Sequence, residues 1–150
     1  MYKRILLAYN SASENALHES VFLAKDQQAQ LRVIHIIDTI RSITGLEYVD
    51  PVSLQEEQRK AAKQLLNKAN KYLKKANIEA ETKVIEIQSL ADNIAETITQ
   101  EAEEWSADLL VLGTKGKSGI KRLLLGSVAE GVIRNATGNY SLLLVKEPKS

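Results

Sequence analysis

The chain has 150 residues, with 20 Lys and Arg against 19 Asp and Glu, so its formal net charge is +1. This length suits one domain with its own core, and the near-neutral charge gives no general case for binding nucleic acid or a membrane surface. The chain has no cysteine and 2 histidines, which excludes disulfides, thiolate zinc sites, a cysteine nucleophile and a His-rich metal site.

The first half of the chain alternates between buried strands and a helix. Residues 5–9 form a short apolar run, which predicts a strand buried on both faces. Ser13 is an N-cap residue type, and helical spacing of apolar residues follows up to Ala24. Residues 31–37 predict a second buried strand, after which the pattern breaks over 38–53 and predicts a loop.

The middle of the chain continues this alternation. Residues 51–75 predict a long helix whose many charges form a solvated face, and residues 78–87 predict a third strand nearer an edge. Ser89 is expected to cap a helix over 90–105. Residues 107–113 then predict a fourth buried strand.

The last elements complete one α/β domain over residues 1–150. A loop over 114–125 precedes a helix from Ser127 to about Ala136, and residues 140–146 predict the final strand. Strands that alternate with helices are typical of an open parallel sheet with helices on both faces. No apolar run approaches the ~20 residues of a membrane span and no signal peptide is visible, so we expect a cytoplasmic protein without membrane contact.

The segment from Gly113 to Ser127 is the main candidate for function. In open α/β sheets, ligands bind outside the carboxyl ends of the strands, and this segment begins at such an end. Gly126 and Ser127 stand at the start of a helix, where free N–H groups and the helix dipole attract an anion. The pattern predicts a polyphosphate site; the alternative is plain glycine turns with solvated lysines. Basic side chains and no acidic ones lie within the segment: Lys115, Lys117, Lys121 and Arg122.

Gly113, Gly116, Gly126 and Ser127 follow the spacing Gly-x-x-Gly, nine residues, Gly-Ser. This spacing resembles the ATP-binding signature of the universal stress protein family. It is not a P-loop, because Val111 stands where that motif needs its first glycine. Other segments are also similar to the family: 2–8, 31–38, 107–116 and 124–130.

The resemblance implies a Rossmann-like fold whose five parallel strands have the order 3-2-1-4-5. It also implies a homodimer paired through the last strand, about Tyr140 to Val145, and a stress-response or regulatory protein without a nucleic-acid partner. The implied ligand is ATP, with AMP, ADP or a cyclic nucleotide as alternatives. The residues expected at the nucleotide are Ala8, Tyr9, Asn10, Ile36, Asp38, Leu112, Gly113, Thr114, Gly116, Gly126, Ser127 and Val128.

Two departures from the family pattern bear on this assignment. The family usually has Asp after the first strand, where this chain has Asn10, and an amide carries no charge with which to hold Mg²⁺ or Mn²⁺. The family's final strand usually follows a proline-containing pair, where residues 138–141 read Gly-Asn-Tyr-Ser. Both departures favour an alternative function, a dimeric interaction module that no longer binds nucleotide.

Three side chains near the strand ends have their own alternatives. Asp38 either orients the nucleotide or a metal, or simply starts the loop after the second strand. Tyr9 either packs on the base or fills core. His35 is expected to be a structural residue, hydrogen-bonded inside the fold. No nucleophile–base pair is visible, so we expect at most a slow ATPase; a hydrolase or nucleotidyl transferase is the third alternative.

Overall fold

The computed structural model describes residues 1–43, 50–115 and 126–148. Strands and helices alternate along these residues, as the sequence predicts. In chain order the elements are β1 (Arg4–Ala8), α1 (Glu14–Gln27), β2 (Gln30–Ile37), α2 (Thr39–Ile43), α3 (Pro51–Lys75), β3 (Ala80–Glu86), α4 (Ile94–Glu104), β4 (Leu109–Lys115), α5 (Ser127–Asn135) and β5 (Ser141–Glu147).

The strands form one parallel sheet in the order β3-β2-β1-β4-β5. This finding confirms the order that the family resemblance implies, and it places β3 at an edge as predicted. Central β1 pairs with both β2 and β4, so Ala8 lies between Ile34 and Leu112. The direction of winding reverses between β1 and β4, and open α/β sheets bind ligands in the crevice at such a reversal.

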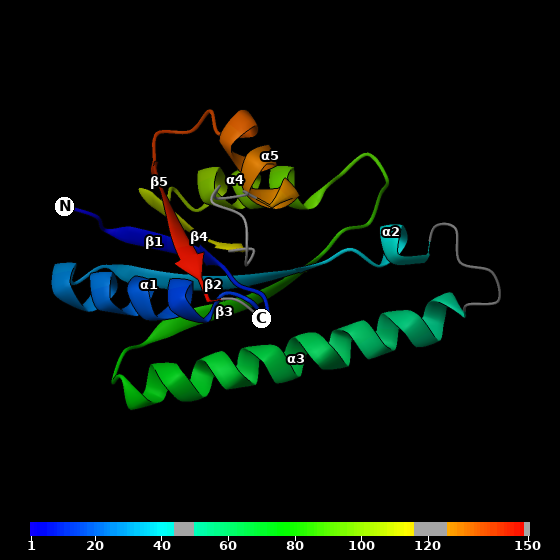
Figure 1. Ribbon diagram of the computed structural model, residues 1–150, viewed down its shortest axis with the longest axis horizontal. Coiled ribbons are helices and arrows are strands. Elements are labelled where there is room, and N and C mark those ends of the chain that lie inside the picture. Colours follow the sequence, from blue (N-terminus) through cyan, green and yellow to red (C-terminus); the bar gives the residue numbers. More distant parts are fainter. Residues whose placement is uncertain (44–49, 116–125, 149–150) are drawn as a thin grey trace.

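The sheet separates two apolar cores. Figure 1 shows α1 and α3 on one face of the sheet and α4 and α5 on the other. Side chains alternate along β1: Ile5 and Leu7 belong to the α1/α3 core, and Leu6 belongs to the α4/α5 core, each 0% exposed. Burial on both faces explains why the central strands are continuous apolar runs. Each such side chain contributes about 1.5–3 kcal/mol to folding, so these strands hold the frame on which the loops at the crevice are built.

The start of α4 differs from the prediction. The helix begins at Ile94, and its N-cap is Asn93, whose side chain accepts a hydrogen bond from the Glu96 N–H at 2.8 Å. Ser89, the predicted cap, instead accepts one from the Ala91 N–H at 3.1 Å within the preceding turn. Both are good cap residues, so their types alone do not decide which one starts the helix.

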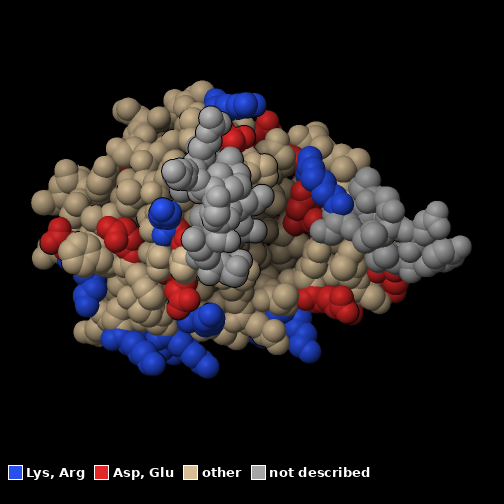
Figure 2. All heavy atoms as spheres, viewed as in Figure 1, with Lys and Arg blue, Asp and Glu red and all other residues tan. Residues whose placement is uncertain are grey.

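The charged helix predicted over 51–75 is α3, and Asp50 caps it by accepting a hydrogen bond from the Val52 N–H at 3.1 Å. Lys and Arg side chains gather along α3 at the lower edge of Figure 2, as expected for a solvated face. The short helix α2 occupies part of the predicted loop over 38–53, which is a second correction. Among the described helices, none combines the length and the apolar character that crossing a membrane requires.

Candidate functional site

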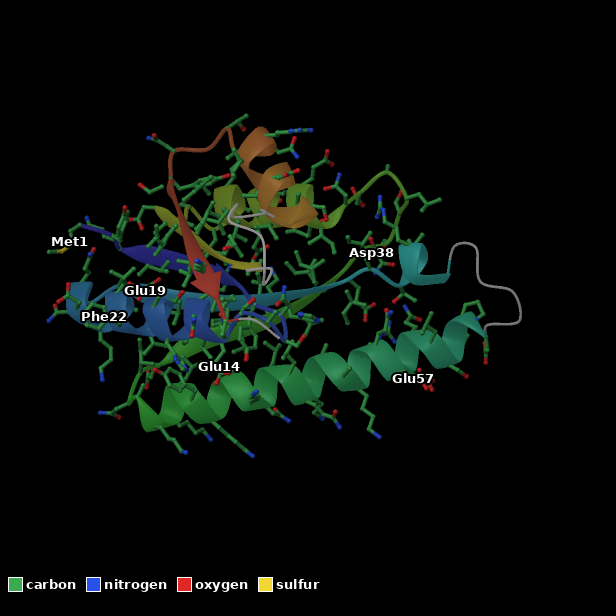
Figure 3. The ribbon with its side chains drawn as sticks, in the orientation of Figure 1. Met1, Glu14, Glu19, Phe22, Asp38 and Glu57 are labelled. Atoms are coloured by element: carbon green, nitrogen blue, oxygen red, sulfur yellow. The ribbon has the colours of Figure 1, made fainter. Side chains whose placement is uncertain are left out.

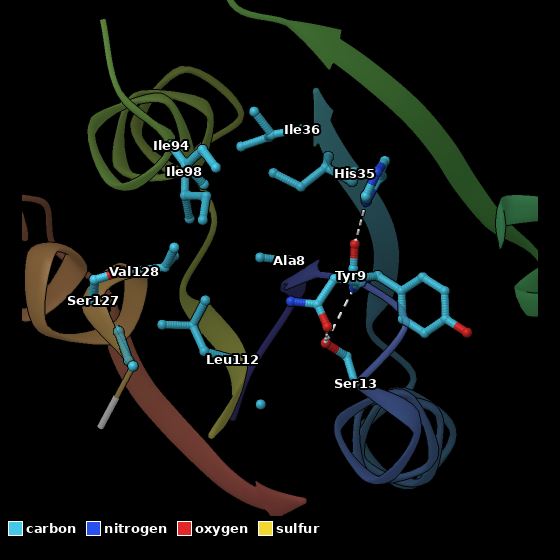
Figure 4. Close-up of a pocket in the computed structure, with 15 residues that line it drawn as sticks. Ala8, Tyr9, Ser13, His35, Ile36, Ile94, Ile98, Leu112, Ser127 and Val128 are labelled. Atoms are coloured by element: carbon cyan, nitrogen blue, oxygen red, sulfur yellow. Dashed lines mark hydrogen bonds between the residues drawn. The ribbon is translucent and has the colours of Figure 1, made fainter. Parts of the chain in front are cut away.

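A cavity of about 440 Å³ lies at the carboxyl ends of β1 and β4, where the sheet reverses its winding. Figure 4 shows the ends of the strands on one side of it and α4 and α5 on the other. This volume is in the range of small-molecule sites. The cavity brings together these predicted site residues: Ala8, Tyr9, Asn10, Ile36, Leu112, Gly113, Gly126, Ser127 and Val128.

Two predicted site residues do not line the cavity, and Gly116 lies outside the described residues. The Asp38 carboxylate accepts a hydrogen bond from the Arg41 N–H at 3.1 Å and pairs with the Arg41 guanidinium at 2.8 Å. Figure 3 shows Asp38 beside α2, and Asp38 stands between the last residue of β2 and the first of α2. Thr114 is 2% exposed, and its hydroxyl donates to the carbonyl of Val145 on β5 at 3.4 Å.

One wall of the cavity is apolar and is formed by side chains of both the sheet and helix α4. Ile36 and Leu112 extend from the strands, and Ile94 and Ile98 face them from α4 (Figure 4). The sequence marks Ile94 and Ile98 only as the buried stripe of a helix, because nothing in that stripe says what lies opposite. The lining residues that sequence reasoning did not assign to the site are Ser13, Ile34, His35, Ile94, Ile98 and Ala129.

Tyr9 and His35 join the ends of β1 and β2. His35 Nδ1 lies 2.8 Å from the Tyr9 carbonyl oxygen (Figure 4). A carbonyl only accepts, so Nδ1 carries the proton, and the predicted structural hydrogen bond of His35 is confirmed. The Tyr9 ring belongs to the α1/α3 core and is 5% exposed, so it fills core and presents its backbone to the cavity. Burial, followed by the nearby Glu14 and Glu147 carboxylates, raises the pKa of Tyr9.

Asn10 closes the turn between β1 and α1. Its Oδ1 accepts hydrogen bonds from the Ala12 N–H at 2.8 Å and from the Ser13 hydroxyl at 2.9 Å. The Asn10 N–H donates in turn to Ser13 Oγ at 3.1 Å. The Ala12 N–H can only donate, which identifies the acceptor as the amide oxygen. The side-chain nitrogen is therefore the atom that this turn leaves unused.

The N-terminus of α5 lies beside the cavity. Gly126 is its N-cap, and no side chain of the described chain makes a cap hydrogen bond there. Gly126 has φ −67° and ψ 163°, which any residue adopts, and a Cβ built on it meets no described atom within 4 Å. Neither backbone conformation nor packing against the described residues requires glycine here. A helix N-terminus of this kind attracts anions.

The N-terminus of α1 is closed by a distant glutamate. Ser13 is the N-cap residue but makes no side-chain cap bond. Glu147 of β5, 4% exposed, accepts from the Asn15 N–H at 2.8 Å and from the Ala16 N–H at 2.7 Å. A Cβ on Gly113 would lie 2.9 Å from Glu147 Oε1. Gly113 therefore leaves room for this carboxylate, and it also lines the cavity.

No carboxylate is among the described residues that line the cavity. The polar groups there include those of Asn10, Ser13, His35 and Ser127. Within the described chain, no cluster of three or more His, Cys, Asp or Glu side chains is placed to hold a metal ion. Among its described residues, the cavity thus combines an apolar wall with polar hydrogen-bonding groups and a helix N-terminus without a side-chain cap. This set suits an apolar ring that bears an anionic group.

Comparisons with known proteins extend over nearly the whole chain. The profile of the universal stress protein family matches residues 1–146. Universal stress protein MJ0531 of Methanocaldococcus jannaschii is 33% identical over 152 aligned residues, which cover 99% of this chain and 85% of that protein. Universal stress protein YxiE of Bacillus subtilis is 32% identical, with 91% of this chain and 95% of that protein covered.

Solved structures share the fold. A protein described as hypothetical protein MJ0577 has a TM-score of 0.74 at 28% identity, with 100% of this chain and 99% of that chain covered. A universal stress protein from Archaeoglobus fulgidus, solved in complex with dAMP, has a TM-score of 0.63 at 19% identity, with 99% and 98% covered. Another, solved in complex with cAMP, has a TM-score of 0.65 at 21% identity, with 98% of both chains covered.

Proposed function

Because the chain belongs to the universal stress protein family, we propose that it binds an adenine nucleotide in the cavity between β1, β4 and α5. In this proposal the nucleotide-bound protein acts as a dimeric regulator of a stress response. The observation that carries the proposal is the open N-terminus of α5 beside an apolar cavity of about 440 Å³. The two solved relatives with cAMP and dAMP support an adenylate as the ligand class.

The two parts of the cavity suit the two ends of a nucleotide. The base packs between the strand side chains Ile36 and Leu112 and the α4 side chains Ile94 and Ile98, where an aromatic ring loses contact with water. The phosphate lies at Gly126 and accepts hydrogen bonds from the first N–H groups of α5. The α1 N-terminus does not compete for it, because the Glu147 carboxylate already occupies that end.

A homodimer through β5 is the second part of the proposal. β5 is an edge strand of the described sheet, so one row of its backbone N–H and C=O groups has no neighbouring strand in that sheet. Its apolar residues from Leu142 to Val145 are only half-buried. A second copy that pairs along 140–145 would cover both the backbone groups and these side chains. Sedimentation equilibrium would show twice the mass of the chain; a monomer mass at micromolar concentration would refute the dimer.

Ser127→Asp tests the nucleotide site without weakening the helix that forms it. A carboxylate in the first turn of α5 stabilises that helix by about 0.3–1 kcal/mol, but it opposes a phosphate at the same helix end. Asn67→Asp is the matched control, because it adds the same charge at an exposed position on α3, across the sheet from the cavity.

Calorimetry with ATP, AMP and cAMP provides the measurement. We expect wild type and Asn67→Asp to bind at least one of these nucleotides, and Ser127→Asp to bind it about tenfold or more weakly with an unchanged or higher melting temperature. The absence of heat and of a thermal shift for wild type at millimolar nucleotide would refute the function. That result would favour the interaction module that has lost nucleotide binding.

A further inference from the structure

Asn10 lines the cavity where β1 ends, and its side-chain nitrogen is the atom that the turn leaves unused. Both of the hydrogen bonds that fix the side chain, from the Ala12 N–H at 2.8 Å and the Ser13 hydroxyl at 2.9 Å, end on Oδ1. No hydrogen bond from Nδ2 to another described residue is found. An amide nitrogen donates only, so it suits an oxygen acceptor on a ligand and opposes a cation.

Two carboxylates near this edge of the sheet already have hydrogen-bond or ion-pair partners. Divalent cations such as Mg²⁺ are held by carboxylates together with substrate phosphates. The two oxygens of Glu147 accept from the Asn15 and Ala16 N–H groups, and the Asp38 carboxylate pairs with Arg41. No carboxylate is among the described residues that line the cavity, so these residues do not fit the Mg²⁺ or Mn²⁺ ion that accompanies a nucleotide triphosphate.

We propose that this site binds its nucleotide without a divalent cation, with Asn10 Nδ2 donating a hydrogen bond to a ligand oxygen. The inference rests on the proposed nucleotide binding. It also names the ligand form: a triphosphate chelates Mg²⁺ through several phosphate oxygens, whereas a monophosphate binds it weakly. In the presence of millimolar Mg²⁺ the site therefore takes the adenine nucleoside monophosphate in preference to the magnesium complex of ATP.

Asn10→Asp isolates this one atom. The remaining carboxylate oxygen keeps both acceptor bonds, from Ala12 and Ser13, so the turn is retained, and the second oxygen replaces Nδ2. The change converts a donor into a charged cation ligand at the same position. Asn67→Asp, at an exposed position on α3, is the control for a negative charge added away from the cavity. Melting temperatures of the three proteins show whether the fold is kept.

The test is calorimetric titration of AMP and of ATP, each in EDTA and in millimolar MgCl₂. For wild type and Asn67→Asp we expect equal AMP affinity in the two buffers and weaker apparent ATP affinity with Mg²⁺. For Asn10→Asp we expect nucleotide affinity in EDTA to be weaker than that of wild type. Addition of Mg²⁺ should then raise the affinity of this variant about tenfold or more. Wild-type binding that strengthens about tenfold with Mg²⁺ overturns the inference while leaving nucleotide binding intact. No binding by wild type in any buffer refutes the proposed function and this inference with it.

Discussion

Removal of the Glu147 carboxylate should destabilise the protein more than its place near the chain end suggests. Glu147 is 4% exposed and accepts two backbone hydrogen bonds, from Asn15 and Ala16 at 2.8 and 2.7 Å. Hydrogen bonds to a charged group contribute about 1.5–3 kcal/mol each. Glu147→Ala leaves two N–H groups of α1 without this partner, and water recovers part of the loss. We expect the free energy of unfolding to fall by about 2–4 kcal/mol.

The same contact predicts a coupling with Gly113. In wild type, the Cβ of Gly113→Ala lies 2.9 Å from Glu147 Oε1 and 3.0 Å from its Cγ, so the carboxylate must move away from α1. Overpacking of this kind costs about 1–3 kcal/mol. In the Glu147→Ala background these atoms are absent, and Gly113→Ala becomes nearly neutral. The coupling free energy in the double-mutant cycle should reach about 1–2 kcal/mol.

Urea unfolding followed by circular dichroism measures all four proteins of this cycle. Gly126→Ala is the control, because its Cβ meets no described atom within 4 Å and its effect should be the same with and without Glu147. If the Gly113→Ala and Glu147→Ala effects add to within about 0.5 kcal/mol, Gly113 does not make room for Glu147. The room beside Gly113 would then be assigned to the ligand.

Two further predictions concern the cavity wall and the outer edge of the sheet. Ile94→Trp, at a half-buried position where α4 begins, fills the space proposed for the base; calorimetry should show loss of nucleotide binding, and unchanged affinity would exclude that position for the base. The Arg59 guanidinium, which donates to the Glu86 carboxylate, holds the pKa of Glu86 below its usual range. This pair therefore adds stability that is present above the unfolded-state pKa of about 4.3 and is lost as the pH falls through the lower folded-state value. Arg59→Ala should raise the Glu86 pKa in an NMR titration, and an unchanged pKa would contradict the pairing.

The strands and most helices could be predicted because their signals are local. A run such as Ile5–Tyr9 is apolar throughout, which is typical of a strand covered on both faces. The start of α4 was missed because Ser89 and Asn93 are both cap residues and lie close together. Local residue types leave such a choice open, and the contacts of the helix with the rest of the fold decide it.

The sequence by itself determined the alternating α/β pattern and the glycine-spaced segment that ends at the start of α5, since both depend on neighbours along the chain. Only the tertiary structure decided how the polar groups around the cavity are used. It showed that Glu147 closes α1 from 131 residues away, and that the oxygen of Asn10 is committed to its own turn. The physical reason is that the partner of each donor and acceptor is set by which elements meet in space.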